Sequence, residues 1–414
     1  MKIIVNNLYS SDKQECLPYK EKDIWLKSAV IGSLWASVEI IMGSFFHNLQ
    51  LPFAGTLLAA FTVIFIVAVL QIWNQTGLIW RAGLICALMK SISPSAVILG
   101  PMTGIFFEAV LLEIFIYIFG RNIFAYTIAG AMAVLSALLH KLLTLLIIYG
   151  WDSVKILAKL YRFAMKQLNI ENINPIDALI VLTSIYVFLG IFAAITGYIL
   201  GQKAKQQKQS ASIDEKIDFS EADSFFRFNK NQKFSVLLLW LNIALVISGM
   251  IIINYYGLIY ASVFAFGYII FSSIRYKNAF RQFKRPFLWL QLVILTILAS
   301  LFYTKSAENS LFNLEGLFIG LNMSVRAIIV ILGFSSISVE LRNPIVKTVL
   351  YKRGFSQVYN SLGLAFSALP SIISKVSKPK QIFKKPFKTI VEILLYMDSL
   401  LVIFTNENKS FDRK

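Results

Sequence analysis

The chain has 414 residues, of which 57% are hydrophobic and only 15% charged, and its mean hydropathy is +0.68. A soluble domain is about half apolar and a quarter charged, so this composition excludes an ordinary soluble protein and predicts a polytopic membrane protein. The formal net charge of +18 is consistent with cytoplasmic loops that are rich in Lys and Arg. The basic residues form no separate domain, so nucleic acid is not an expected partner.

Ten apolar stretches approach the length of about 20 residues that a transmembrane helix needs. They cover residues 28–46, 52–72, 77–92, 95–119, 122–149 and 178–200, then 234–254, 257–274, 286–304 and 316–337. Residues 201–232 between the two groups are rich in Lys, Gln and Ser and are predicted to form a polar cytoplasmic linker. The predicted fold class is all-α, with about 10 transmembrane helices in two bundles, six in domain 1–200 and four or five in domain 233–414, plus cytoplasmic amphipathic helices.

Basic loops set the expected orientation. With the N-terminus in the cytoplasm, the linker and the basic stretches 275–286 and 340–353 also fall inside. Residues 150–177 then fall outside, although their basic residues at helical spacing predict an amphipathic helix on the membrane surface or over a binding site. The last apolar stretch, 389–404, is short for a span, so it either lies in the interface or crosses the membrane.

Ionisable side chains inside the apolar stretches indicate a functional site. Glu39 is the clearest case, because a glutamate side chain is too short to reach the headgroups. The predicted topology places most such groups in the outer half of the first six spans. The candidate solute-binding residues are Trp35, Glu39, His47, Asn48, Lys90, Glu108 and His140. Convergent polar groups of both signs fit a small cationic, zwitterionic or anionic ligand from outside; the alternative is that each charge only pairs with a neighbour.

Two further patterns occur in the first block. Arg81 and Glu113 fall at the inner side of the membrane, where an ion pair between them is expected. The first span carries small residues at helical spacing, which favours the close docking of another helix. The candidate docking residues are Ala29, Gly32, Ser33, Ala36 and Ser37. No sequence such as HxxxH or HExxH is present, so no metal site is expected.

A series of short motifs lies between residues 316 and 375. It consists of a Gly-Leu pair, an arginine inside an apolar helix, two serines, a proline and a later Leu-Pro pair. The positions are Gly320, Leu321, Arg326, Ser336, Ser338, Pro344, Leu369 and Pro370. This series resembles the transmembrane T component of energy-coupling factor (ECF) vitamin transporters. The first block is similar to the substrate-binding S component in its six spans, its small-residue stripe and its outer polar groups, so the chain resembles an S–T fusion.

The resemblance implies that the first domain captures a vitamin or other micronutrient at a bacterial inner membrane and that the second couples it to separate ATPase subunits. The chain holds no GxxxxGK[ST] phosphate loop, so it is not expected to be an enzyme, and ATP would be used by the partner subunits rather than bound as a cofactor here. The candidate coupling residues are Arg342, Lys352, Arg353 and Gly354. The stretch after Pro370 is shorter than the family's coupling helix, which leaves open a secondary transporter or a membrane scaffold working without ATPases.

Overall fold

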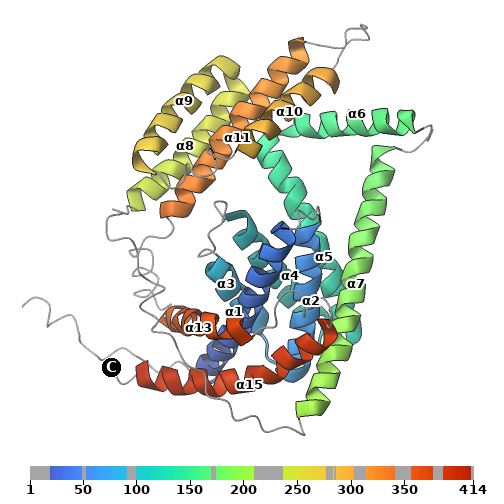
Figure 1. The fold of residues 1–414 in the computed structure, drawn as a ribbon, viewed down its shortest axis with the longest axis vertical. Helices are drawn as coiled ribbons and strands as arrows, with labels where there is room; N and C mark the ends of the chain where they lie inside the picture. Colours follow the sequence, from blue (N-terminus) through green and yellow to red (C-terminus); the bar gives the residue numbers. More distant parts are fainter. Residues whose placement is uncertain are drawn as a thin grey trace, which may run out of the picture.

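The computed structural model of the protein describes residues 19–48, 53–90, 99–168, 174–208, 236–276, 283, 286–302, 314–340, 356–375 and 386–411. Every regular element in these ranges is an α-helix (Figure 1), which confirms the all-α fold class. The helices are α1 (Tyr19–Asn48), α2 (Ala54–Ile72), α3 (Leu78–Lys90), α4 (Leu99–Phe119), α5 (Ile123–Tyr149), α6 (Trp151–Gln167), α7 (Pro175–Lys208), α8 (Val236–Tyr255), α9 (Leu258–Arg275), α10 (Pro286–Phe302), α11 (Leu314–Glu340), α13 (Ser356–Lys375) and α15 (Pro386–Phe411).

Eight helices in the described part of the chain are long and apolar enough to cross a membrane, judged by length and composition: α1, α2, α4, α5, α7, α8, α9 and α11. They support a multi-pass membrane protein. Of the ten predicted spans, the two that fall short are α3 and α10, with 13 and 17 residues. At a rise of 1.5 Å per residue α3 is about 20 Å long, less than the hydrocarbon core of about 30 Å.

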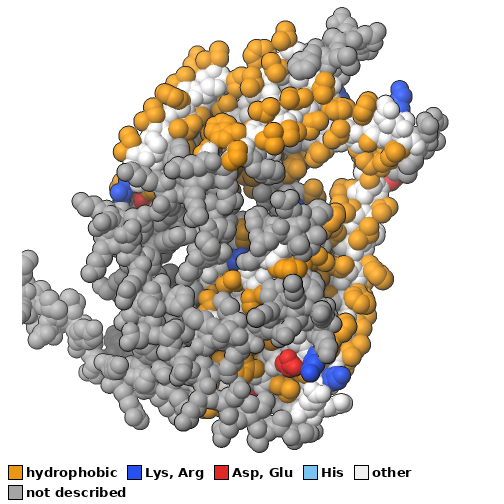
Figure 2. Space-filling view, in the orientation of Figure 1, with side chains coloured by type: hydrophobic (Ala, Val, Ile, Leu, Met, Phe, Trp, Pro, Cys, Tyr) orange, Lys and Arg blue, Asp and Glu red, His pale blue; other side chains and the backbone are white. Residues whose placement is uncertain are grey.

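Hydrophobic side chains cover the outward faces of the long helices. Figure 2 shows them over α7 and over the group formed by α8, α9 and α10. Phe188 on α7 and Val263 on α9, for example, are 72% and 71% exposed. An apolar surface of this extent would be unfavourable in water. These faces therefore suit contact with lipid chains.

Glycine lets α7 lie directly on α2 and α5. A side chain at Gly197 of α7 would come within 2.6 Å of the Ile64 carbonyl oxygen on α2. Gly130 of α5 and Gly190 of α7 meet backbone to backbone in the same way. Apolar side chains gain little by leaving lipid for another helix, so helices in membranes associate through such close van der Waals packing. These glycines fix where α7 lies along its two neighbours.

Helix α1 is surrounded by helices from both ends of the chain. It packs against α2 and α3, which follow it directly, and against α13 and α15, which are the last two helices described. Its small-residue stripe is buried, and Gly32 within it lies against Ile85 and Ala82 of α3. The role of this stripe in docking the two predicted domains stays a prediction, as do the domain bounds.

Helix α15 contains the short apolar stretch 389–404. Figure 1 shows it running across the ends of α1 and α7 rather than alongside them, and it is not among the helices apolar and long enough to span. Met397, Leu400 and Phe404 are buried in the same core as the residues of α1 and α2. In the structure this stretch is therefore a packed crossing helix, and its position agrees with the interfacial alternative.

Helix α6 occupies most of the basic stretch 150–177. It packs against α10 and α11, with Ile156 beside Ala299 and Met323 and with the rings of Phe163 and Phe302 5.4 Å apart. Lys155 and Arg162 are exposed. The helix is amphipathic as predicted, and its apolar side covers the second group of helices.

The helices α8, α9 and α11 share a buried chain of hydrogen bonds. The Tyr268 hydroxyl donates to Asn242 Oδ1 (2.9 Å), Asn242 Nδ2 donates to the Tyr276 hydroxyl (2.8 Å), and that hydroxyl donates to Glu340 Oε1 (3.0 Å). Burial and the bond to Glu340 raise the pKa of Tyr276 above its ordinary value. A satisfied network of this kind fixes the relative positions of the three helices.

Candidate functional site

An ion pair joins α1 and α3. Lys90 Nζ lies 3.3 Å from Glu39 Oε2 and donates to the Glu39 carbonyl oxygen at 3.1 Å. The side chains of Lys90 and Glu39 are only 14% and 7% exposed. A side chain at Gly43 would come within 3.3 Å of Nζ, so glycine leaves room for the ammonium group. Lys90 also ends α3, where a cation is favoured by the helix dipole.

A second carboxylate, Glu108 of α4, is buried close to this ion pair. It is 6% exposed, and its Oε1 has no hydrogen-bond partner among the residues that the structure describes. Helix α4 approaches α3 closely because Gly83 of α3, which has no side chain, lies directly against the methyl group of Ala109 of α4. Glu39 lies near enough to Glu108 for the two carboxylates to repel each other. The cluster thus holds two acids and one base, and one carboxylate oxygen of Glu108 has no hydrogen-bond partner in the part of the chain that the structure describes.

The other predicted binding residues lie around this cluster at different distances. His140 of α5 approaches α4 at Gly104, one turn before Glu108. Trp35 lies one turn before Glu39 on α1 and is fully buried, with its Nε1 donating to Thr62 Oγ1 at 3.0 Å. His47 and Asn48 belong to the last turn of α1, but their side chains lie outside the described residues. The structure therefore brings Glu39, Lys90 and Glu108 together and places Trp35 in the core beneath them.

The sequence did not predict the surroundings of two residues, Cys86 and Glu113. Cys86, one turn before Lys90 on α3, is fully buried among the charges of Glu39, Lys90 and Glu108. Its position four residues before Lys90 on the same helix was the feature of the sequence that could have placed it near the cluster. Glu113, expected to pair with Arg81, accepts hydrogen bonds from the backbone N–H groups of Gly77, Ile79 and Trp80 at the start of α3.

Arg81 makes contacts with two aromatic rings and with the backbone. Its guanidinium lies 5.2 Å from the ring centre of Trp25 and 4.6 Å from that of Trp80, and its Nη1 donates to the Gly77 carbonyl oxygen. Cation–π contacts of this kind are strongest at desolvated sites. Together with the carboxylate of Glu113 they hold the beginning of α3, so that its other end presents Lys90 to Glu39.

Arg326, the in-helix arginine of α11, lies where α5 ends and α6 begins. Its Nε and Nη1 make long hydrogen bonds of 3.4 Å to the Ile147 carbonyl oxygen and to Asn254 Oδ1. Gly150 has a φ of +80°, and a side chain there would come within 2.7 Å of Nη1. A polar cavity of about 50 Å³ beside the guanidinium is lined in part by Asp152. This arginine therefore joins α11 to the end of α5 and to α8.

The predicted coupling residues Arg342, Lys352, Arg353 and Gly354 lie outside the described residues. Comparison with known proteins adds nothing to the site: no protein-family model, no curated protein and no solved structure matches the chain. The site therefore has to be interpreted from its own chemistry.

Proposed function

We propose that the chain is the membrane component of an importer of the energy-coupling factor type, which captures a small polar solute from the outside. The observation that carries the proposal is the buried carboxylate of Glu108, without a hydrogen-bond partner for Oε1 among the described residues, beside the Glu39–Lys90 ion pair. Leaving such a group unpaired costs about 1–3 kcal/mol, and more when it is charged. A binding site tolerates this cost because its ligand brings the missing donor.

The charge of the cluster narrows the solute class. Glu39 and Glu108 contribute two carboxyl groups and Lys90 one ammonium group, so the cluster has one acid more than it has bases. Ligand sites in membrane helices pair their buried charges with a charge of the opposite sign. The proposed solute therefore presents an ammonium or another cationic nitrogen group to Glu108, as a cationic or zwitterionic micronutrient does.

The packing around α1 supports a link between capture and coupling. This helix carries Glu39 of the polar cluster, and it also contacts α13 and α15 from the C-terminal part of the chain. Displacement of α13 or α15 by separate ATPase subunits would thus act on the helix that holds the solute. In this proposal the ATPases bind near residues 341–355 and hydrolyse the ATP. The chain has about ten membrane helices, in bundles of six and of four or five, and lies in a bacterial inner membrane with its N-terminus in the cytoplasm.

A secondary transporter is the second candidate, and Glu108 also favours it. A buried carboxylate facing a binding site can carry a proton across the membrane, as acidic residues do in many transporters. Such a protein, like a membrane scaffold, works without ATPases, so partner subunits separate these alternatives from the importer.

Native mass spectrometry of the complete protein, purified with its complex from its own membrane, tests the proposal. We expect two ATPase subunits and a small bound molecule with a cationic nitrogen group. Arrival of the chain with a small molecule but without ATPases would favour the secondary transporter. Arrival alone and empty would contradict capture of a solute by this chain.

A further inference from the structure

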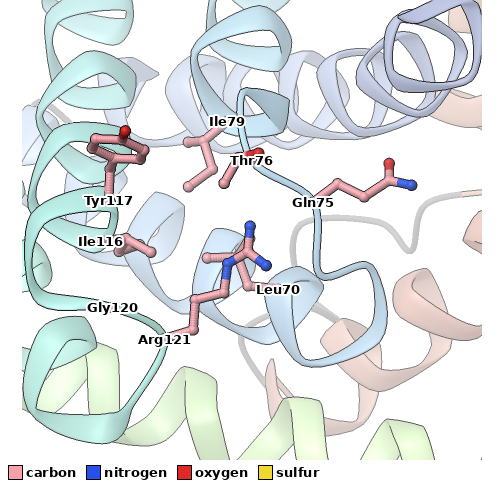
Figure 3. Close-up of a pocket in the computed structure, with 8 residues that line it drawn as sticks. All are labelled: Leu70, Gln75, Thr76, Ile79, Ile116, Tyr117, Gly120 and Arg121. Carbon is pink, nitrogen blue, oxygen red and sulfur yellow. The ribbon is translucent and has the colours of Figure 1, made fainter. Parts of the chain in front are cut away.

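A second, larger cavity lies at the opposite end of α3 from Lys90. It has a volume of about 350 Å³, is open on one side, and is bordered by the turn between α2 and α3 and by the turn between α4 and α5 (Figure 3). This size falls within the range of about 300–1,000 Å³ that is common for small-molecule sites. None of the proposed solute-binding residues lines it, so it is separate from the cluster around Glu108.

The ends of three candidate spans place this cavity at the membrane boundary. The span in α2 ends at Ile72, the span in α4 ends at Phe119, and the span in α5 begins at Ile123. All three points border the cavity, whose lining includes Leu70 and Gly120. In the predicted orientation this end faces the cytoplasm. A molecule in the cavity would thus lie at the depth of lipid headgroups and of the first carbons of their chains.

The lining combines an apolar floor with one cationic group. Leu70, Ile79 and Ile116 supply the apolar surface, and Figure 3 shows the guanidinium of Arg121 pointing into the cavity toward Thr76. Among the described residues, Arg121 donates one hydrogen bond, from Nη1 to the Asn74 carbonyl oxygen at 3.1 Å. A guanidinium has five N–H donors, so others are available to a ligand. None of the described residues that line the cavity is acidic.

We propose that this cavity binds an anionic phospholipid of the adjacent leaflet, with its phosphate on Arg121 and Thr76 and the start of an acyl chain on Leu70, Ile79 and Ile116. Arginine binds phosphate through parallel N–H donors, which accounts for the polar half of the lining. The apolar floor would make no favourable contact with a free phosphate ion, but it can pack against an acyl chain. Tyr117 at the rim is 77% exposed, as aromatic residues are at membrane interfaces.

The bound lipid has a structural consequence for the solute site. Ile79 lines the cavity, and its backbone N–H is one of those held by Glu113 at the start of α3. The same helix presents Lys90 to Glu39 at its other end. An occupied cavity would therefore stabilise the helix that bridges the two sites, which ties solute retention to the lipid composition of the membrane.

Native mass spectrometry of the full-length protein in detergent, titrated with phosphatidylglycerol, tests the proposal. We expect one retained lipid in the wild type and about tenfold to hundredfold weaker retention in Arg121→Gln, the loss that accompanies one charge-assisted hydrogen bond. Arg162→Gln is the matched control, because Arg162 is exposed on α6, far along the chain from the cavity, and we expect its retention to equal the wild type.

A second variant keeps the test decisive if Arg121→Gln does not fold. Thr76 is exposed in the turn before α3, so Thr76→Phe narrows the cavity without entering the core, and we expect it to weaken lipid retention as well. A parallel titration with inorganic phosphate separates the two sources of the phosphate group. Competition by phosphate at concentrations comparable to the lipid, or equal retention by the wild type and both variants, would overturn the proposal.

Discussion

Two buried glutamates in different parts of the molecule have opposite surroundings. Glu340 at the end of α11 is 2% exposed and accepts a hydrogen bond from Tyr276, which is itself held by Asn242. Glu108 in α4 is 6% exposed, and its Oε1 has no partner among the described residues. Burial alone therefore does not identify a site. The unsatisfied carboxylate is the one that a ligand can complete, while the satisfied one holds helices together.

The largest expected effect comes from breaking the buried ion pair. Lys90→Met leaves Glu39 buried without its cation, and loss of one partner of a buried pair costs about 3–5 kcal/mol of stability. The double variant Glu39→Gln with Lys90→Met removes both charges, so we expect it to recover most of this loss. Denaturant unfolding in detergent measures both. Equal losses in the single and double variants would show that the pair is not the source of the stability.

The satisfied carboxylate should behave as a structural residue. Glu340→Leu leaves the Tyr276 hydroxyl without its acceptor, and a buried hydroxyl left unpaired costs about 1–3 kcal/mol. We expect a lower apparent Tm in detergent and unchanged retention of solute. Loss of solute without a change in Tm would mean that this network belongs to the binding site.

The unsatisfied carboxylate should behave in the opposite way. Glu108→Leu replaces a buried acid, whose Oε1 has no partner among the described residues, with an apolar side chain of similar volume, so we expect stability to be unchanged or higher by about 1 kcal/mol. The same unfolding measurement in detergent tests this. A loss as large as that of Glu340→Leu would show that Glu108 has a structural partner.

The smallest effect concerns alkaline pH. The folded protein holds the Tyr276 proton more tightly than the unfolded chain, in which the pKa is near 10, so above that pH the folded state binds more protons. The free energy of unfolding therefore decreases as the pH rises above about 10. Tyr276→Phe should flatten this part of the curve, as measured by apparent Tm between about pH 8 and 11. An identical slope in both proteins would exclude Tyr276 as its source.

Hydropathy predicted the helices well because a membrane demands long apolar segments, whatever their neighbours. It also placed Glu39 and Lys90 in the outer half of the membrane and Glu108 near mid-depth, since depth follows from position along a helix. Hydropathy could not predict which of these side chains contact one another, because it does not determine which helices are neighbours in the bundle. Two glycines determine these contacts: Gly83 lets α4 approach α3, and Gly43 leaves room for the ammonium group of Lys90.

Other features depended on tertiary structure in the same way. The sequence predicted Arg81 as a partner of Glu113, but it could not predict the three backbone N–H donors that Glu113 gains beside the first turn of α3. The stretch 389–404 was too short to classify by hydropathy, and the core beneath α15 places it across the ends of the spans. Helix α6 was recognised as amphipathic, but its packing against α10 could not be predicted from its own sequence.

The most direct test of the account is the amount of small molecule retained by the protein purified from its own membrane, measured by native mass spectrometry for the wild type, Glu108→Gln and Glu392→Gln. Glu392 is a matched control, because it is 55% exposed and lies on α15, outside the cluster. We predict that Glu392→Gln retains the molecule as the wild type does and that Glu108→Gln loses it while remaining folded. Full retention by Glu108→Gln would contradict the central claim that this carboxylate binds the solute.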